Sequence, residues 1–272
     1  NDPAVRHWIE SAALSGSDLV AAARTPANTL HVLLADGAGH GLAASVSVLP
    51  IIAPFYRMTE KGFGIDAIVR EMNAKIRELL PLNRFVAVTL AAVDFREEYV
   101  RVWNGGNPSP LMQASDIRAE HLFELRHLPL GVLADEEFEA TTETRAFTDG
   151  AQLILYSDGL IEAENAAGTP FGFARRAEAL GSVAADAKFA AAVDAVRRHV
   201  RAGPPCDDIS LVAVSCRHEV NANTARSRKA ILVVSLFIFL IGMLAVFGIS
   251  TVITGPLSQM VETVGRIAQG DL

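Results

Sequence analysis

Two short apolar runs end in the same way, with an aspartate followed by a glycine, and this feature constrains the fold most. HVLLA runs into Asp36–Gly37, and LILYS runs into Asp158–Gly159. An apolar run of this length, bounded by turn residues, is typical of a buried strand. Each Asp-Gly step therefore places a carboxylate at the buried edge of a sheet, where an unpaired charge is costly.

The remaining segments favour an α+β fold. Strands in runs and helices in pairs indicate antiparallel sheets rather than alternating strand–helix–strand units. Proline at two positions predicts a bend in the first helix. The predicted strands are 29–35, 85–95, 99–103, 141–147, 152–157 and 209–215, and the predicted helices are 42–58 (with Pro50 and Pro54), 64–80, 172–180 and 186–200.

Composition excludes several classes of protein. The chain is 50% hydrophobic and 20% charged, which excludes a disordered or collagen-like protein. Its net charge of −7 argues against nucleic acid as a partner. The two cysteines, Cys206 and Cys216, imply no disulfide framework and fit a reducing compartment.

Four aspartates stand at the ends of predicted strands or in adjoining turns: Asp18, Asp36, Asp158 and Asp207. Taken singly, an aspartate before a glycine is most often a turn residue. Taken together, the four aspartates place carboxylate oxygens, which can bind a metal ion, at the buried edge of a sheet. Mg²⁺ and Mn²⁺ take oxygen ligands and retain several waters. The set therefore predicts a divalent-metal site, with a structural turn as the alternative for each aspartate.

An ordered set of motifs resembles the PPM-type (PP2C-like) serine/threonine phosphatases, and within them the SpoIIE/RsbU branch of bacterial partner-switching. The resemblance covers about residues 15–215, in the family's order. It implies a PP2C-like αββα sandwich of two antiparallel sheets flanked by helices, with two Mn²⁺ or Mg²⁺ ions between the sheets. The motifs are GSD (16–18), ADGAGHGLAAS (35–45), WNGGNPSPL (103–111), LPLGV (128–132), LYSDGLIEAEN (155–165) and DDIS (207–210).

The resemblance assigns metal-binding roles to five of these residues. By the family's motifs, Asp36 bridges both ions, and the carbonyl of Gly37 is a ligand of one. Asp158 and Asp207 hold the other ion. Asp18 matches the acidic residue of the first motif and contributes directly or through bound water.

Four further positions qualify this assignment. Asp208 is an additional candidate ligand, although the family often has asparagine there. Ser17 departs from the usual Gly-Gly-Asp of the first motif. Asn107 stands where the family often has histidine, which bears on substrate-side contacts and not on the metals. His40 is a candidate acid for the leaving serine oxygen, and a helix-start histidine that hydrogen-bonds the loop is the alternative.

The resemblance implies a metal-dependent protein serine/threonine phosphatase. Metal-activated water attacks the phosphorus of phosphoserine or phosphothreonine, so no enzyme nucleophile is needed. Consistent with this, Cys206 has no arginine in the ten residues that follow it. The branch implies a phosphorylated anti-sigma-factor antagonist of the STAS type as substrate. The alternative is a catalytically inactive phosphatase-like binding module, although all four metal aspartates are present.

Residues 230–253 contain no charged side chain and predict one transmembrane helix after the sandwich. A helix of this length spans ~36 Å, enough for a hydrocarbon core of ~30 Å. A buried core helix is less favoured because every face is apolar. Basic residues in the juxtamembrane linker, 218–229, place the preceding domain in the cytoplasm by the positive-inside rule, with the chain anchored in the cytoplasmic membrane.

The two ends of the chain suggest neighbouring modules. Residues 254–272 resemble the first helix of a HAMP signal-relay module. HAMP modules lie in the cytoplasm, and one span cannot leave both flanks there, so the topology of the tail stays open. Residues 1–14 predict the end of a linker helix from a missing sensor or receiver domain, and we expect the chain to be a fragment. The phosphatase domain is predicted over 15–217.

Overall fold

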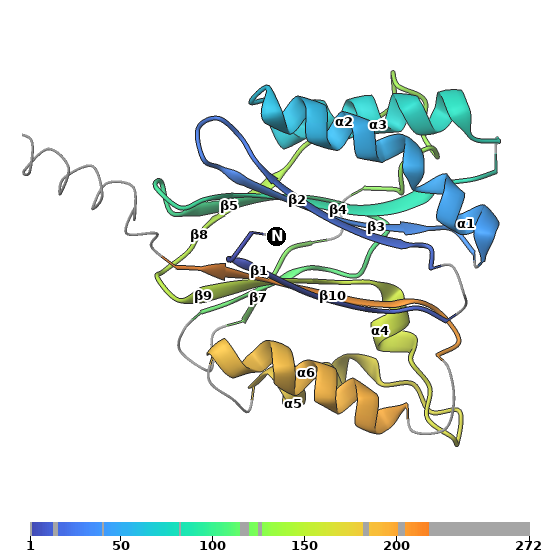
Figure 1. Cartoon of the computed structure of the whole chain (residues 1–272), viewed down its shortest axis with the longest axis vertical. Coiled ribbons are helices and arrows are strands. Elements are labelled where there is room, and N and C mark those ends of the chain that lie inside the picture. Colours follow the sequence, from blue (N-terminus) through green and yellow to red (C-terminus); the bar gives the residue numbers. More distant parts are fainter. Residues whose placement is uncertain are drawn as a thin grey trace, which may run out of the picture. The chain divides into compact units, whose positions relative to one another are not determined.

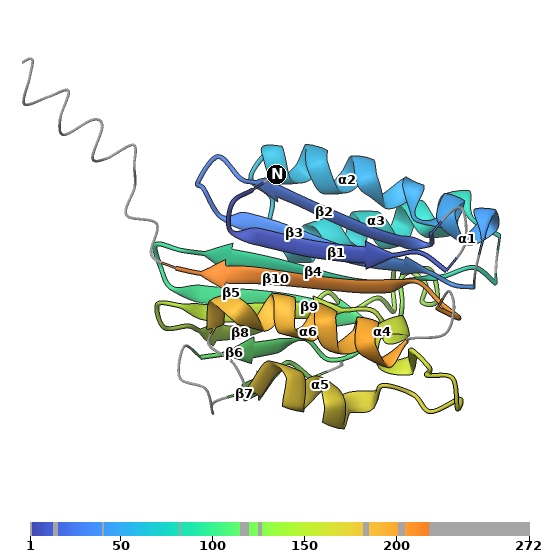
Figure 2. The same ribbon diagram turned by 60° about the horizontal axis from the view of Figure 1, so that its bottom comes forward.

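Two antiparallel sheets of five strands each pack face to face, and helices cover the outer face of each sheet (Figure 1). In the computed structural model, sheet A has the strand order β1-β10-β9-β6-β7, and sheet B has the order β2-β3-β4-β5-β8. Helices α2 and α3 lie on sheet B, and α5 and α6 lie side by side on sheet A (Figures 1 and 2). This is the αββα sandwich that the resemblance implies.

The structure describes residues 2–12, 16–39, 41–81, 83–114, 120–124, 127–181, 185–200 and 205–217. The strands are β1 Val5–Glu10, β2 Asp18–Arg24, β3 Leu30–Gly37, β4 Val86–Asp94, β5 Tyr99–Gly105, β6 Leu111–Gln113, β7 Glu120–Leu122, β8 Glu143–Ala146, β9 Ala151–Tyr156 and β10 Ile209–Cys216. The helices are α1 Leu42–Ser47, α2 Leu49–Glu60, α3 Ile65–Leu79, α4 Asp158–Glu162, α5 Gly172–Gly181 and α6 Ala185–His199.

Three apolar layers hold the sandwich together. Alternate residues of β3 face opposite ways: Leu34 packs between the sheets, whereas Leu33 packs under α2 and α3. The third layer joins sheet A to α5 and α6, through residues such as Ile154 and Val196. Because both faces of each sheet are covered, the central strands are apolar throughout rather than alternating. This is why β3, β9 and β10 are readily predicted from sequence.

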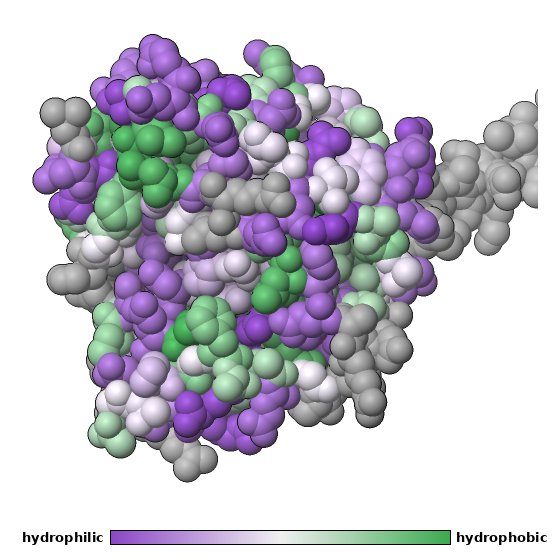
Figure 3. Space-filling model, turned by 180° about the vertical axis from the view of Figure 1, so that it is seen from behind, coloured by the Kyte–Doolittle hydropathy of each residue, from purple (hydrophilic) through white to green (hydrophobic). Residues whose placement is uncertain are grey.

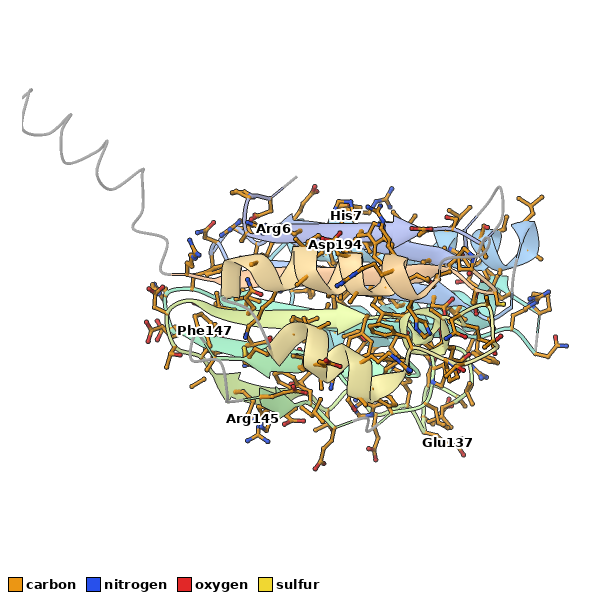
Figure 4. All side chains as sticks on the ribbon, turned by 90° about the horizontal axis from the view of Figure 1, so that it is seen from below. Arg6, His7, Glu137, Arg145, Phe147 and Asp194 are labelled. Carbon is orange, nitrogen blue, oxygen red and sulfur yellow. The ribbon has the colours of Figure 1, made fainter. Side chains whose placement is uncertain are left out.

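The N-terminal prediction is wrong. Residues 1–14 do not end a linker helix, because Val5–Glu10 forms strand β1, which pairs antiparallel with β10 at the edge of sheet A. Arg6 and His7 are exposed and point outward from this strand (Figure 4). The compact unit runs from Asn1 to His218, so the predicted domain start at residue 15 comes too late.

Helices α1 and α2 are unusually apolar for outer helices. The run Leu42–Glu60 meets the length and hydropathy expected of a membrane span. However, Ile51 and Phe55 are fully buried against sheet B, as in the core helix of a globular protein. Its outer side exposes large side chains, including Leu42, which is 72% exposed. The face seen in Figure 3 likewise carries separate apolar patches in a hydrophilic surface.

The second unit, Glu219–Leu272, lies outside the described residues. The predicted juxtamembrane linker over 218–229, the transmembrane helix over 230–253 and the HAMP-like segment over 254–272 fall in that part of the chain.

Candidate metal centre

The predicted aspartates meet at one edge of the sandwich, where strand ends from both sheets come together. Asp18 begins β2 and lies directly opposite Asp36, near the end of β3. Asp158 begins α4, one residue beyond the end of β9. Asp207 precedes β10, the antiparallel neighbour of β9. Sheet B therefore supplies one pair of carboxylates, and sheet A supplies the other.

Electrostatics shows that these carboxylates act on one another. Burial, and after it the negative charges of Asp18, Asp158 and Asp207, raise the pKa of Asp36 to about 9. A raised pKa of this kind is expected for a carboxylate that is taken out of water among like charges. The edge is therefore a place where positive charge is strongly favoured.

Asp18 is half-buried as a residue, and both of its carboxylate oxygens are buried. Burial raises its pKa to about 6, although the nearby hydroxyls of Ser210 and Ser157 lower it. These hydroxyls lie close enough to favour the ionised form, but neither oxygen of Asp18 accepts a hydrogen bond of normal geometry from a described group. One oxygen of Asp158 is likewise buried without a donor.

Asp208 plays a different part from the other aspartates. It is 5% exposed, and it accepts hydrogen bonds from the Ala12 amide at 2.7 Å and from the Ser17 hydroxyl at 2.8 Å. The Ser17 amide donates to the same carboxylate. Asp208 thus ties the loop before β2 to the start of β10 across the two sheets. Both of its oxygens have donors, which favours an anchoring role over that of a metal ligand.

Two serines that the sequence reasoning did not single out support this edge. The Ser210 amide donates to the Ser157 hydroxyl at 2.9 Å, and the Ser157 hydroxyl donates to the backbone oxygen of Asp208 at 3.3 Å. Both are fully buried. A signal was available, because each serine lies next to or two residues from an aspartate of a recognised motif.

Close backbone approach explains two of the motif glycines. A Cβ on Gly159 would lie 2.1 Å from the backbone oxygen of Asp208. A Cβ on Gly37 would lie 2.5 Å from both the Ala44 backbone oxygen and the Ser47 hydroxyl oxygen. Real side chains do not approach this closely, so glycine lets α4 and α1 pack directly onto the loops that carry the aspartates.

The residues at this edge fit a divalent cation. A buried carboxylate oxygen that accepts no hydrogen bond destabilises the folded protein. Mg²⁺ and Mn²⁺ prefer oxygen ligands of this kind. Within the described part of the chain, however, no three His, Cys, Asp or Glu side chains already converge as a ligand group. We therefore expect an ion bound here to keep several of its waters.

Two other predicted residues have different outcomes. The prediction that Asn107 contacts substrate is wrong, because it is only 2% exposed. Its amide donates to the Thr89 hydroxyl at 3.1 Å, and its backbone oxygen accepts from Asn104 at 2.9 Å. It belongs to a buried polar network between strands. His40 lies outside the described residues.

The sequence was compared with the profiles of known protein families. The sequence profile described as Stage II sporulation protein E (SpoIIE) matches residues 26–217 of the chain. The chain belongs to the SpoIIE family. The SpoIIE match ends where the described strands end, and it begins after β2. No match is found among the curated proteins.

Solved structures share the SpoIIE fold at low sequence identity. The SiaA-PP2C domain of Pseudomonas aeruginosa has a TM-score of 0.68 and 19% identity, over 78% of this chain and 85% of that one. The PP2C phosphatase domain and regulatory fragment of SpoIIE from Bacillus subtilis give 0.67 and 18%, over 78% and 62%. RsbX in complex with magnesium gives 0.59 and 13%, over 78% and 92%. These likenesses establish a PP2C-type fold.

Proposed function

We propose that this SpoIIE-family chain is a metal-dependent protein serine/threonine phosphatase. The observation that carries the proposal is the group of aspartates at one edge of a PP2C-type fold, with buried oxygens on Asp18 and Asp158 that accept no hydrogen bond from described groups. An edge built this way favours divalent cations, and the magnesium in RsbX supports extending that chemistry to this chain.

Asp36, Asp158 and Asp207 are the side chains that would hold two Mn²⁺ or Mg²⁺ ions, together with the carbonyl of Gly37 and with Asp18 directly or through water. When bound, such ions activate water at neutral pH and offset the charge of a transferring phosphoryl group. The part of the protein is to keep the carboxylates ionised and fixed. Ser157 and Ser210 favour the ionised form of Asp18, and Asp208 anchors the loop that leads into β2.

We infer that the substrate is a phosphorylated protein of a partner-switching pathway, of the STAS antagonist type. The support is membership of the SpoIIE family. A catalytically inactive binding module is less favoured, because all the predicted metal aspartates are present and lie at one edge.

The test is phosphate release by the purified full chain from p-nitrophenyl phosphate and from a phosphoserine peptide, with Mn²⁺, with Mg²⁺ and with EDTA. Asp36→Asn should reduce kcat by roughly 100-fold or more, since metal ions supply several kcal/mol of transition-state stabilisation. Asp194→Asn on α6 is the matched control, because that aspartate is exposed (Figure 4). Turnover that survives chelation, or near-normal turnover by Asp36→Asn, would refute the proposal.

We further propose that residues 230–253 anchor the chain in the cytoplasmic membrane, with the phosphatase domain in the cytoplasm. The support is the absence of charge in this segment and the basic residues before it. Partition of the full chain between membrane and aqueous fractions tests this. A chain that stays entirely in the aqueous fraction as a monomer would contradict the proposal.

A further inference from the structure

Arg84 lies against the loop that follows Asp36. It stands two residues before Val86, the first residue of β4, which pairs with Gly37. Its Nη1 donates to the backbone oxygen of Ala38 at 3.1 Å, and the Ala38 amide donates to the backbone oxygen of Phe85 at 3.2 Å. Two hydrogen bonds therefore hold the segment of Arg84 beside the loop, in antiparallel alignment with it.

The guanidinium also reaches the next residue of the loop. A Cβ built on Gly39 would lie 3.8 Å from Nη1, which is ordinary contact distance. Gly39 has a positive φ of 91°, and as a glycine it places no side chain over the arginine. The half-buried Arg84 thus sits where the backbone passes from the predicted metal ligand Gly37 to helix α1.

Arg84 differs from three other arginines of the chain in the partner of its guanidinium. Arg24 pairs with Asp2, Arg145 with Glu143, and Arg176 with Glu120. Arg84 forms no ion pair with a carboxylate among the described residues, and the one hydrogen bond described for its guanidinium goes to a neutral carbonyl. A guanidinium has five N–H donors in a rigid fork that matches phosphate oxygens, so most of its donors remain for an anion.

The net charge of the edge explains why an anion bound here would need a nearby arginine. The edge carries five aspartates, namely Asp18, Asp36, Asp158, Asp207 and Asp208. When all are ionised, they outweigh two divalent cations by one negative charge. A phosphomonoester carries up to two more negative charges near neutral pH, so it would enter a site that is already net negative. One cation beside the loop removes that excess.

We propose that Arg84 binds the phosphoryl group of the substrate, as a phosphate-binding residue beside the loop that follows Asp36. Nη1 stays on the Ala38 carbonyl and fixes the guanidinium, while the remaining N–H groups donate to non-bridging phosphoryl oxygens. The inference rests on the proposed phosphatase function. It adds a positively charged contact that sequence motifs of metal-binding aspartates do not supply.

The test uses the full chain loaded with Mn²⁺, with inorganic phosphate as the probe. Arg84→Met should weaken phosphate binding by roughly 10- to 100-fold, the range of charge-assisted hydrogen bonds, both as a competitive inhibitor and in a calorimetric titration. The KM for p-nitrophenyl phosphate should rise in parallel, with a smaller change in kcat. Arg84→Lys should recover part of the loss, because it restores the charge without the fork.

Two measurements separate this role from simple support of the loop. Arg77→Met is the matched control, because Arg77 is an exposed arginine in the last turn of α3, and it should leave phosphate binding unchanged. Mn²⁺ affinity and thermal stability of Arg84→Met should stay close to those of the unmodified chain. A loss of Mn²⁺ affinity that matches the loss of phosphate binding, with no rescue by lysine, would assign Arg84 to the loop and overturn the inference.

The inference and the proposed function fail in different ways. If the unmodified chain shows no metal-dependent turnover, the phosphatase proposal fails, and calorimetry with phosphate still reads the contribution of Arg84. If the unmodified chain turns over and Arg84→Met binds phosphate within twofold of it, the inference about Arg84 fails and the phosphatase proposal stands.

Discussion

Asp36 lies opposite Asp18 on neighbouring strands, within the influence of two further aspartates, and we expect Asp36→Asn to stabilise the metal-free protein. The same substitution should abolish the response to metal. A residue kept for metal binding at the expense of stability would have this double signature, whereas a turn aspartate with a structural role would lose stability when replaced.

The size of the effect follows from proton linkage. The pKa of Asp36 is raised from its ordinary value of 3.8 to about 9, by burial first and then by neighbouring negative charges. Between these values the folded protein binds more protons than the unfolded chain, so the free energy of unfolding falls as pH rises through that window. From pH 3.8 to pH 7 this amounts to about 4 kcal/mol.

Asparagine is neutral at every pH and removes this penalty. Proton sharing with Asp18 relieves part of the repulsion in the unmodified protein, so we expect a gain of about 2–4 kcal/mol at pH 7. The gain should be smaller at pH 5 and largest near pH 9. Mn²⁺ should raise the stability of the unmodified chain in proportion to the logarithm of its concentration, and should raise that of Asp36→Asn much less.

Urea unfolding in EDTA at pH 5, 7 and 9 measures the first effect, and the same series with added Mn²⁺ measures the second. Asp194→Asn, an exposed change of the same kind, should shift the unfolding free energy by less than about 0.5 kcal/mol at each pH. The reasoning would be refuted if metal-free Asp36→Asn were less stable at pH 7, or if its advantage did not grow with pH.

Two further predictions concern a buried histidine of β3 and a motif glycine of α4. Burial lowers the pKa of His31 to about 4, so the unfolded chain binds the extra proton between pH 6.5 and 4; about 3 kcal/mol of stability present above pH 6.5 should be lost as pH falls through this window. Urea titrations of His31→Gln should show a flatter pH dependence, and an unchanged slope would contradict the burial argument. Gly159→Ala should cost roughly 1–3 kcal/mol, because its Cβ would lie 2.1 Å from a backbone oxygen. Gly181→Ala, which has open space around it, is the control, and equal thermal stability of the two variants would sink the close-approach explanation.

Local pattern was sufficient for the elements that are buried on both faces. The run before Asp36 and the run before Asp158 are strands β3 and β9, as predicted, because only a covered strand is apolar at every position. The amphipathic helix over 64–80 is α3, Ile65–Leu79. In each case, the hydropathy pattern of one segment is enough to predict the element.

Edge and short elements were missed for the opposite reason. The sequence does not predict strand β1, because its exposed residues break the alternation and β10, the strand with which it pairs, lies about 200 residues away in the sequence. Strand β2 is rich in alanine, which favours helix when considered alone. Pairing with β3 makes it a strand, and no local propensity reports that pairing.

The candidate site divides along the same line. The aspartates could be selected from sequence because each follows or begins a strand-like run, and the order of motifs predicted the SpoIIE family that the profile then established. The roles of Asn107 and Asp208 could not be predicted. The residue type does not show whether a side chain is buried among hydrogen-bond partners or exposed at a substrate cleft.

The sequence alone specifies which carboxylates this chain carries at its strand ends, since an apolar run followed by Asp-Gly marks its own boundary. Folding is needed to bring Asp18 and Asp36 of one sheet to Asp158 and Asp207 of the other. It also places Arg84 against the loop after Asp36. These contacts join residues far apart in the chain. Pairing between strands forms the contacts within one sheet, and the packing of the two sheets brings the aspartates of one sheet to those of the other.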